Sequence, residues 1–385
     1  MRKSQSMDTA VGGVSGETNV DLGLRLATGR GRRQDPSLGG AVMRRGGSRE
    51  GDEQVVTMES IAAHAGVSLS TVSRVLNNTV PVSRSKRAAV LKAVEALGYR
   101  PNVVAQELAR GHTQAIGVLP QGISNPFYSR LLKGVEQGLR GSDFYPLFAS
   151  GEHPAEEGEA LDLLLAHRIE ALILVGGHIP DEELVGVAKR MPVVAIGRNI
   201  QGLEGRCVRV ENLEGGYKAT RYLRELGHAR IAHITGHPWH GDATARRDGY
   251  ERALADTGIA VDPALIVQGD FEEQSGLAAT EKLLKAGIPF TAIFAGNDQM
   301  AFGAALALFR SGLRIPQDVS LVGFDDQPSA AYSWPPLTTV RQPTVEMGMA
   351  AARAILDELR GRRFVQPTFH TDLVLRASTA VPRAQ

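Results

Sequence analysis

From Thr113 onward, short β-rich runs alternate with amphipathic stretches of helical period. A strand–helix order repeated along residues 113–385 predicts two doubly wound lobes, each with a parallel sheet covered by helices. Strands are expected at Ala115–Leu119, Tyr145–Ala149, Ala171–Val175, Val193–Ile196, Cys207–Val210, Arg230–Ile234, Leu265–Val267, Ala292–Phe294 and Val319–Phe324. Helices are expected at Phe127–Arg140, Glu214–Leu226, Ala245–Thr257, Gln274–Ala286 and Asp298–Ser311.

A second pattern precedes the lobes, with apolar residues at helical spacing over three short stretches. The first stretch predicts a helix at Met58–Ala65 with Thr57 as its N-cap. Gly66 supplies a left-handed turn position that a residue with a Cβ would resist. Ser68 is expected to cap the second helix by accepting a hydrogen bond from the Thr71 backbone N–H.

The third stretch predicts a helix that begins after a Ser83 cap and ends at Gly98. The buried stripes expected on the three helices are Ile61, Ala62 and Ala65, then Val72, Val75 and Leu76, and finally Val90, Leu91, Val94 and Leu97. These three helices would form a small domain with its own core.

The second helix turns Leu69, Ser70, Ser73 and Arg74 away from that core. An Arg can bond a guanine bidentately, a Ser is permissive, and a Leu can pack on a thymine methyl. Two helices around an Ala-Gly turn can also be a plain packing unit. The alternative is a helix-turn-helix that reads the major groove, and the three ordered motifs described below favour it.

Charge and composition agree with DNA binding by one part of the chain only. The net charge is +1, yet Val55 to Arg110 holds seven Lys and Arg against three Glu. A single cysteine, Cys207, excludes an internal disulfide framework. With no long apolar stretch and no signal-peptide pattern, we expect a cytoplasmic protein without a membrane partner. Residues 1–54 are rich in Gly, Arg and Ser and are expected to be a disordered tail. They are either an inert tail, a product of a mis-assigned start, or a DNA-touching arm.

Ligands of doubly wound sheets bind beyond the carboxyl ends of the strands. Aromatic, amide and charged side chains follow the predicted strands at these ends. They suit a polyhydroxyl ligand, because aromatic faces cover the C–H side of a sugar and charged groups bind its hydroxyls. Arg198, which follows the Val193–Ile196 run, could also reach such a ligand.

Three motifs occur in one order: Ala-Gly-Val-Ser at 65–68, Thr-Val-Ser-Arg-Val-Leu-Asn at 71–77, and Leu-Gly-Tyr-Arg-Pro-Asn at 97–102. This string resembles the LacI/GalR family of bacterial transcription regulators, and the similarity runs from Val55 to Ala380. The resemblance implies an all-α helix-turn-helix headpiece joined to an α/β core of two lobes, like that of periplasmic binding proteins.

The resemblance also implies roles for individual residues. Base contacts would come from Leu69, Ser70 and Arg74, and contacts to the DNA backbone from Thr57, Ser68, Thr71, Ser73 and Asn77. A hinge at 102–109 would become helical on the operator, with Asn102 and Ala105 at the DNA and Leu108 wedged into the minor groove. Effector contacts would come from Phe127, Tyr128, Arg246, Phe271, Asn297 and Asp325. Glu211 departs from the family's Asp-Asn pattern; it either resizes the pocket or sits at a lobe crossover.

The expected organisation is a tail at 1–54, a headpiece at 55–100, a hinge at 101–112 and a core at 113–385. Within the core, an N-lobe would comprise about 113–212 and 343–369, and a C-lobe about 213–342 and 370–385.

The predicted function is that of a repressor whose affinity for operator DNA is controlled by a sugar or sugar derivative. By resemblance, the chain would act as a homodimer on a pseudo-palindromic operator. No cofactor is expected, and no metal either, because the spacing of His228, His233, His237 and His240 fits no helix-borne ligand pair. The alternatives are a solute-binding protein without a DNA role and an enzyme on the same architecture. The first would need an export signal, and the second a catalytic constellation that the sequence does not show.

Overall fold

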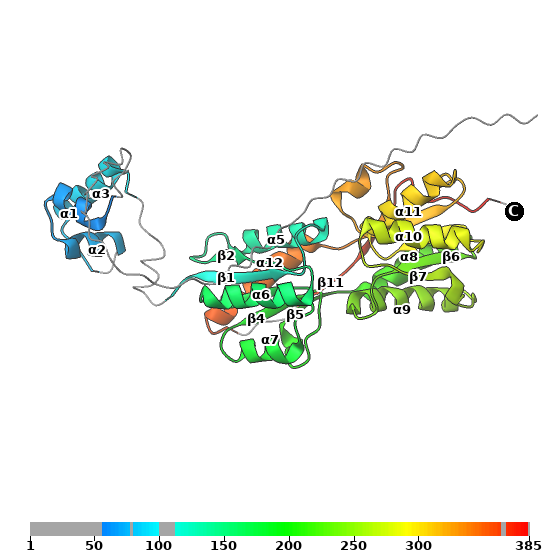
Figure 1. Ribbon diagram of the computed structural model, residues 1–385, viewed down its shortest axis with the longest axis horizontal. Helices are drawn as coiled ribbons and strands as arrows, with labels where there is room; N and C mark the ends of the chain where they lie inside the picture. The colour runs from blue at the N-terminus through cyan, green and yellow to red at the C-terminus, as the bar shows by residue number, and fades with distance from the viewer. Residues whose placement is uncertain (1–55, 78–79, 100–111, 363–366, 384–385) are drawn as a thin grey trace, which may run out of the picture. The chain divides into compact units, whose positions relative to one another are not determined.

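The structure is a computed structural model that describes residues 56–77, 80–99, 112–362 and 367–383. Its first helix, α1 (Met58–Ala65), has the predicted bounds (Figure 1). Helix α2 (Leu69–Asn77) begins after Ser68 as predicted, and α3 (Arg84–Leu97) lies between Ser83 and Gly98 as predicted. Gly66 has a φ of +63°, and the Ser68 Oγ accepts a hydrogen bond from the Thr71 N–H at 3.3 Å. The predicted turn and the predicted cap are therefore confirmed.

Two predictions for the headpiece were wrong: the burial of Leu91 and the capping hydrogen bond of Ser83. The fully buried side chains are Ile61, Val72, Val75, Val90 and Ala93. Leu91 is 49% exposed, because the inward positions of α3 follow helical spacing through 90, 93, 94 and 97. Ser83 stands at the start of α3 without a capping hydrogen bond, and its Oγ lies 3.4 Å from the Ser85 Oγ.

The first of two six-stranded sheets is parallel throughout, in the order β11-β5-β4-β3-β1-β2. Its strands are β1 (Ala115–Pro120), β2 (Tyr145–Phe148), β3 (Ala171–Val175), β4 (Val193–Ile196), β5 (Cys207–Val210) and β11 (Thr368–Phe369). Its helices are α5 (Pro126–Leu139) and α12 (Thr344–Leu359), which share one core, and α6 (Pro154–Ala166) and α7 (Asp181–Ala188), which share the other. Along β3, Ile173 faces the first core and Leu172 and Leu174 the second, so both faces of the sheet are buried.

The second sheet has the order β12-β10-β9-β8-β6-β7 and is parallel except for the β10–β12 pair. Its strands are β6 (Ile231–Thr235), β7 (Ile266–Gln268), β8 (Ala292–Ala295), β9 (Ser320–Asp325), β10 (Thr338–Arg341) and β12 (Asp372–Val374). Helices α8 (Asn212–Glu225) and α9 (Gly241–Asp256) border one core, and α10 (Glu273–Lys285) and α11 (Asp298–Arg310) the other (Figure 1). The predicted two-sheet α/β fold and its nine strands are confirmed, whereas β10, β11 and β12 were not predicted.

Close packing of α8 against α9 fixes the position of α9, which carries Arg246. A Cβ on Gly216 of α8 would overlap the carbonyl oxygen of Arg246 on α9, and Gly249 of α9 meets the backbone of α8 in the same way. The two helices therefore cross in backbone contact. This contact sets the position from which the Arg246 side chain reaches the end of the sheet.

Candidate functional site

Six of the seven predicted effector residues line one small cavity of about 40 Å³. They are Phe127 and Tyr128 in the first turn of α5, Arg246 on α9, Phe271 after β7, Asn297 after β8 and Asp325 at the end of β9. Helix α5 covers the first sheet, whereas the other residues belong to the second. Residues up to 198 positions apart thus meet beyond the carboxyl ends of parallel strands, where such folds bind ligands.

Arg246 is the buried cation of the cavity. Its Nε donates to the Asn212 Oδ1 at 2.8 Å, and its Nη1 donates to the Gly296 carbonyl at 2.6 Å. The guanidinium lies 3.8 Å from the ring centroid of Phe324, in cation–π geometry, and its Nη1 is 3.8 Å from the Asp325 Oδ1. The guanidinium is therefore held in one orientation before any ligand arrives.

Asp325 is a buried carboxylate on the same wall. Burial raises its pKa from 3.8 to about 6, although Arg246 acts in the opposite direction. Its Oδ1 accepts a hydrogen bond from the Gln342 Nε2 at 2.6 Å. The backbone at Asp325 has a φ of +112° and that at Phe271 a φ of +75°. Strained backbone of this kind clusters at binding sites, which supports the assignment of both residues.

Asn297 connects the start of α11 to the segment that carries Phe271. Its Oδ1 caps α11 by accepting from the Met300 N–H at 2.9 Å, and its Nδ2 donates to the Phe271 carbonyl at 2.8 Å. Tyr128 is tied to the first sheet, because its hydroxyl donates to the Gln121 Oε1 at 2.9 Å, and burial raises its pKa. Asn297 and Tyr128 thus give the cavity its shape as well as lining it.

Three further residues of the cavity were missed in the sequence: Asn125, His240 and Asp242. Asn125 could have been found, because Asn before Pro at a helix start is a capping signal. Its Oδ1 does accept from the Phe127 N–H at 3.0 Å, and its Nδ2 donates across the cavity to the Glu272 Oε1 at 3.0 Å. Burial lowers the pKa of His240 to about 4 and raises that of Asp242 to about 6. No spacing rule singled these two out.

Arg198 lies outside the small cavity, in a neighbouring cleft of about 1100 Å³. Its Nη1 donates to the Gly177 carbonyl at 2.9 Å, and its Nη2 lies 2.5 Å from the Asp181 Oδ1. The guanidinium thus orders the loop after β3. The structure brings the other six predicted residues together and leaves Arg198 in the adjoining space.

Glu211 sits where the chain crosses from β5 to α8, and His370 where it crosses from β11 to β12. The Glu211 Oε2 lies 2.9 Å from the His370 Nδ1. Both residues also line the large cleft. The departure from the Asp-Asn pattern therefore falls at a lobe crossover, and the longer side chain spans the two connecting segments.

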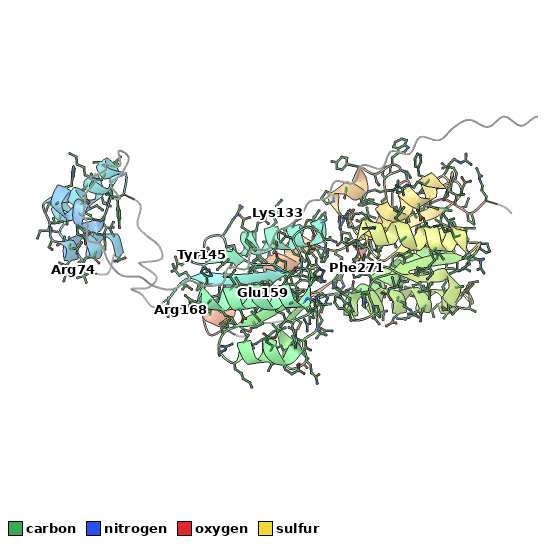
Figure 2. The ribbon with its side chains drawn as sticks, viewed as in Figure 1. Arg74, Lys133, Tyr145, Glu159, Arg168 and Phe271 are labelled. Carbon is green, nitrogen blue, oxygen red and sulfur yellow. The ribbon has the colours of Figure 1, made fainter. Side chains whose placement is uncertain are left out.

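The outer face of α2 carries the predicted DNA-reading side chains. Arg74 is exposed on this face (Figure 2). Ser70 is exposed too, and Leu69 is 42% exposed although it is apolar. Ser73 accepts a hydrogen bond from the Asn77 Nδ2 at 3.2 Å. Thr57, Ser68 and Thr71 lie at or near the starts of α1 and α2. Asn102, Ala105 and Leu108, with the tail at 1–54, lie outside the described residues.

The described part of the chain contains neither a candidate metal site nor a candidate membrane-spanning helix. It contains no group of three His, Cys, Asp or Glu side chains that could hold a metal ion. Two of the four histidines considered as metal ligands have other partners. The imidazole of His228 is hydrogen-bonded to Thr291 and Ser320, and that of His233 is stacked between Tyr250 and Phe294. None of the described helices has both the length and the hydropathy that a membrane span requires.

A helix-turn-helix unit that exposes Arg74, followed by two mostly parallel sheets with a polar cavity between them, defines a ligand-responsive DNA-binding protein. Residues 57–102 match the family described as bacterial regulatory proteins, lacI family, and residues 220–379 match the periplasmic binding protein-like domain. The chain belongs to the LacI family of bacterial regulatory proteins. It is a DNA-binding transcriptional regulator and not an enzyme.

Relatives and solved structures agree with this assignment. The HTH-type transcriptional regulator GalR of Escherichia coli K12 is 38% identical over 332 residues, which are 85% of this chain and 97% of GalR. The complex of the transcriptional regulator CelR with cellobiose is 34% identical, with a TM-score of 0.65, over 84% of this chain and 99% of CelR. The lac repressor dimer bound to operator and the anti-inducer ONPF is 29% identical, with a TM-score of 0.74, over 85% of this chain and all of that one.

Proposed function

We propose that this regulator is a repressor whose operator affinity is set by a sugar or sugar derivative bound between its two sheets. The cavity carries this proposal, because it combines the aromatic rings of Phe127 and Phe271 with the guanidinium of Arg246 and the carboxylate of Asp325. Aromatic faces cover the apolar side of a sugar, and charged groups bind its hydroxyls. CelR, a relative over most of the chain, was solved with cellobiose.

The size of the cavity explains how binding would be transmitted. About 40 Å³ is far below the ~300–1,000 Å³ of pockets that hold small ligands, so a sugar ring enters only if the walls separate. The walls belong to different sheets, which form an N-lobe (about 113–212 and 343–369) and a C-lobe (about 213–342 and 370–385). A ligand that favours one separation of the lobes shifts the protein toward it, and a hinge at 101–112 would pass that shift to the DNA.

On the operator, Leu69, Ser70 and Arg74 would contact bases, because they are the exposed residues on the outer face of α2. The residues proposed to contact the DNA backbone are Thr57, Ser68, Thr71, Ser73 and Asn77. In the hinge, Asn102 and Ala105 would lie at the DNA, and Leu108 would be the minor-groove wedge.

The proposed assembly is a homodimer on a pseudo-palindromic operator, as in the lac repressor dimer. The second lobe leaves three large side chains in water: Phe309 is 78% exposed, Tyr332 88% and Trp334 94%. Aromatic residues are enriched at the cores of protein interfaces, so these three are the proposed contacts between subunits. Because the proposed partner is chromosomal operator DNA, the proposed location is the cytoplasm.

A solute-binding protein without a DNA role is the weaker alternative, because the headpiece would then have no purpose. An operator selected from random duplexes by the purified protein tests the proposal. Fluorescence anisotropy on that operator should show an affinity change of about 5- to 150-fold with an effector sugar. Arg246→Met should retain operator binding and lose the sugar response.

The matched control for this experiment is Arg247→Met. Arg247 lies on the same helix, is exposed and pairs with Glu251 at 2.7 Å. Its variant should respond to sugar like the unmodified protein. A full sugar response in Arg246→Met would contradict the proposed site.

A further inference from the structure

We propose that the effector is an uncharged glycan of two sugar units, one bound in the small cavity and the other in the neighbouring cleft against Trp239. This inference rests on the proposed function and names its ligand more closely. His240 and Asp242 line both the cavity and the cleft, so the two spaces adjoin and one ligand can extend from the first into the second. A cleft of about 1100 Å³ has the volume of sites that hold ligands larger than a single sugar ring.

Trp239 offers the platform for the second unit. It is 47% exposed and lines the cleft, and its ring centroid lies 4.1 Å from that of His178. The fully buried Glu157 fixes His178 through two contacts. The Glu157 Oε2 accepts from the backbone N–H of His178 at 2.6 Å, and the Glu157 Oε1 lies 2.8 Å from the imidazole Nδ1 of His178. The indole is therefore supported by a fixed neighbour, and an apolar ring surface faces the cleft, as the C–H face of a sugar requires.

The cleft holds both paired and unpaired cations, so the choice between a neutral and a phosphorylated ligand falls at its junction with the small cavity. Arg198 pairs with Asp181, the His370 Nδ1 lies 2.9 Å from Glu211, and the Lys218 Nζ donates to the Thr371 carbonyl at 2.7 Å. Arg209 also lines the cleft; its Nη2 donates to the Glu204 carbonyl at 3.4 Å, and its buried Nε has no hydrogen-bond partner among the described residues.

Asp242, at the junction of the two spaces, accepts no hydrogen bond from the described residues. A carboxylate can only accept, so it is satisfied by the hydroxyl donors of a sugar. A phosphate placed at this junction would instead meet a second negative charge. The geometry therefore selects hydroxyls at the point where the two sugar units join.

The test uses the two tryptophans of the chain, Trp239 and Trp334. In a full-length Trp334→Phe variant, the remaining indole reports on the cleft alone. Cellobiose, lactose, maltose and melibiose are titrated beside glucose, galactose and glucose 6-phosphate, with heat and fluorescence as readouts. At least one disaccharide should bind about tenfold or more tighter than its component monosaccharides, a difference of ~1.4 kcal/mol, and only disaccharides should change the Trp239 emission.

Trp239→Ala should lower the disaccharide affinity about tenfold and leave monosaccharide affinity within about twofold. Asp242→Asn should reduce the preference for the neutral disaccharide over glucose 6-phosphate. Monosaccharide binding as tight as disaccharide binding, or tighter binding of the phosphate, would overturn this inference while the proposed function stood. If no sugar bound, or if bound sugar left operator affinity unchanged, the proposed function itself would fail.

Discussion

Replacing Asp325 by Asn is expected to stabilise the free protein while it removes the response to effector. Burial has raised the pKa of this carboxyl from 3.8 to about 6, against the pull of Arg246. Each pKa unit corresponds to ~1.4 kcal/mol, so at neutral pH the ionised carboxylate costs the folded state about 3 kcal/mol relative to a neutral group. Asn keeps the shape and an oxygen that accepts from Gln342.

The pH dependence follows from the direction of the shift. A raised pKa means that the folded protein binds this proton more tightly than the unfolded chain does. The cost is therefore absent below pH ~4, grows as the pH rises from 3.8 to about 6, and is complete above that interval. Urea unfolding of both proteins should show the variant more stable by up to about 3 kcal/mol at neutral pH, with the difference vanishing near pH ~4.

Asp326→Asn is the matched control with the opposite sign. Burial alone would raise the pKa of Asp326, but Arg341 at 2.7 Å and Arg376 at 2.5 Å hold it below the usual value. Removal of this charge leaves two arginines without their partner and should destabilise the protein at neutral pH. If Asp325→Asn were less stable than the unmodified protein at neutral pH, the attraction of Arg246 would outweigh the cost of burial, and the electrostatic account of the cavity would be refuted.

Five other substitutions test three separate parts of the molecule. Arg74→Ala should lose about 1–3 kcal/mol of base discrimination while sugar binding persists, and retained sequence preference in a footprint would argue against the recognition helix. Gly216→Ala should destabilise the C-lobe by about 1–3 kcal/mol in urea, because its methyl overlaps the Arg246 carbonyl. Gly158→Ala on α6, where a methyl meets open space, should be neutral or stabilising. In the headpiece, Val90→Ala should lower the melting temperature, whereas Leu91→Ala should change stability by less than about 0.5 kcal/mol, and equal effects would contradict the core described above.

The local elements of this protein could be predicted from its sequence. Helices α1 and α2 and the strands from β1 to β9 depend on runs of apolar residues, on caps such as Ser68 and on the left-handed turn at Gly66. These signals involve only a few neighbouring residues, so they can be recognised in the sequence without knowledge of the fold. The short strands β10, β11 and β12 were missed because each contains only one or two apolar residues and so forms no apolar run.

The membership of the site could be predicted only in part. The rule that ligands bind beyond strand ends, together with the family resemblance, pointed to six residues that do meet in one cavity. Arg198 also follows a strand, yet the loop after β3 engages its guanidinium in the adjoining cleft. His240 and Asp242 carry no motif, and only the packing of α9 places them between the two spaces.

The sequence by itself determined most of the helices and strands, because periodicity, caps and turns depend on residues that are close together in the chain. It also predicts the DNA-reading face of α2. The tertiary structure alone decided that His240 and Asp242 line the cavity, that Leu91 points outward, and that Glu211 reaches His370 across two crossovers. Those relations depend on strand order and on how closely helices approach at glycines, which only the assembled core fixes.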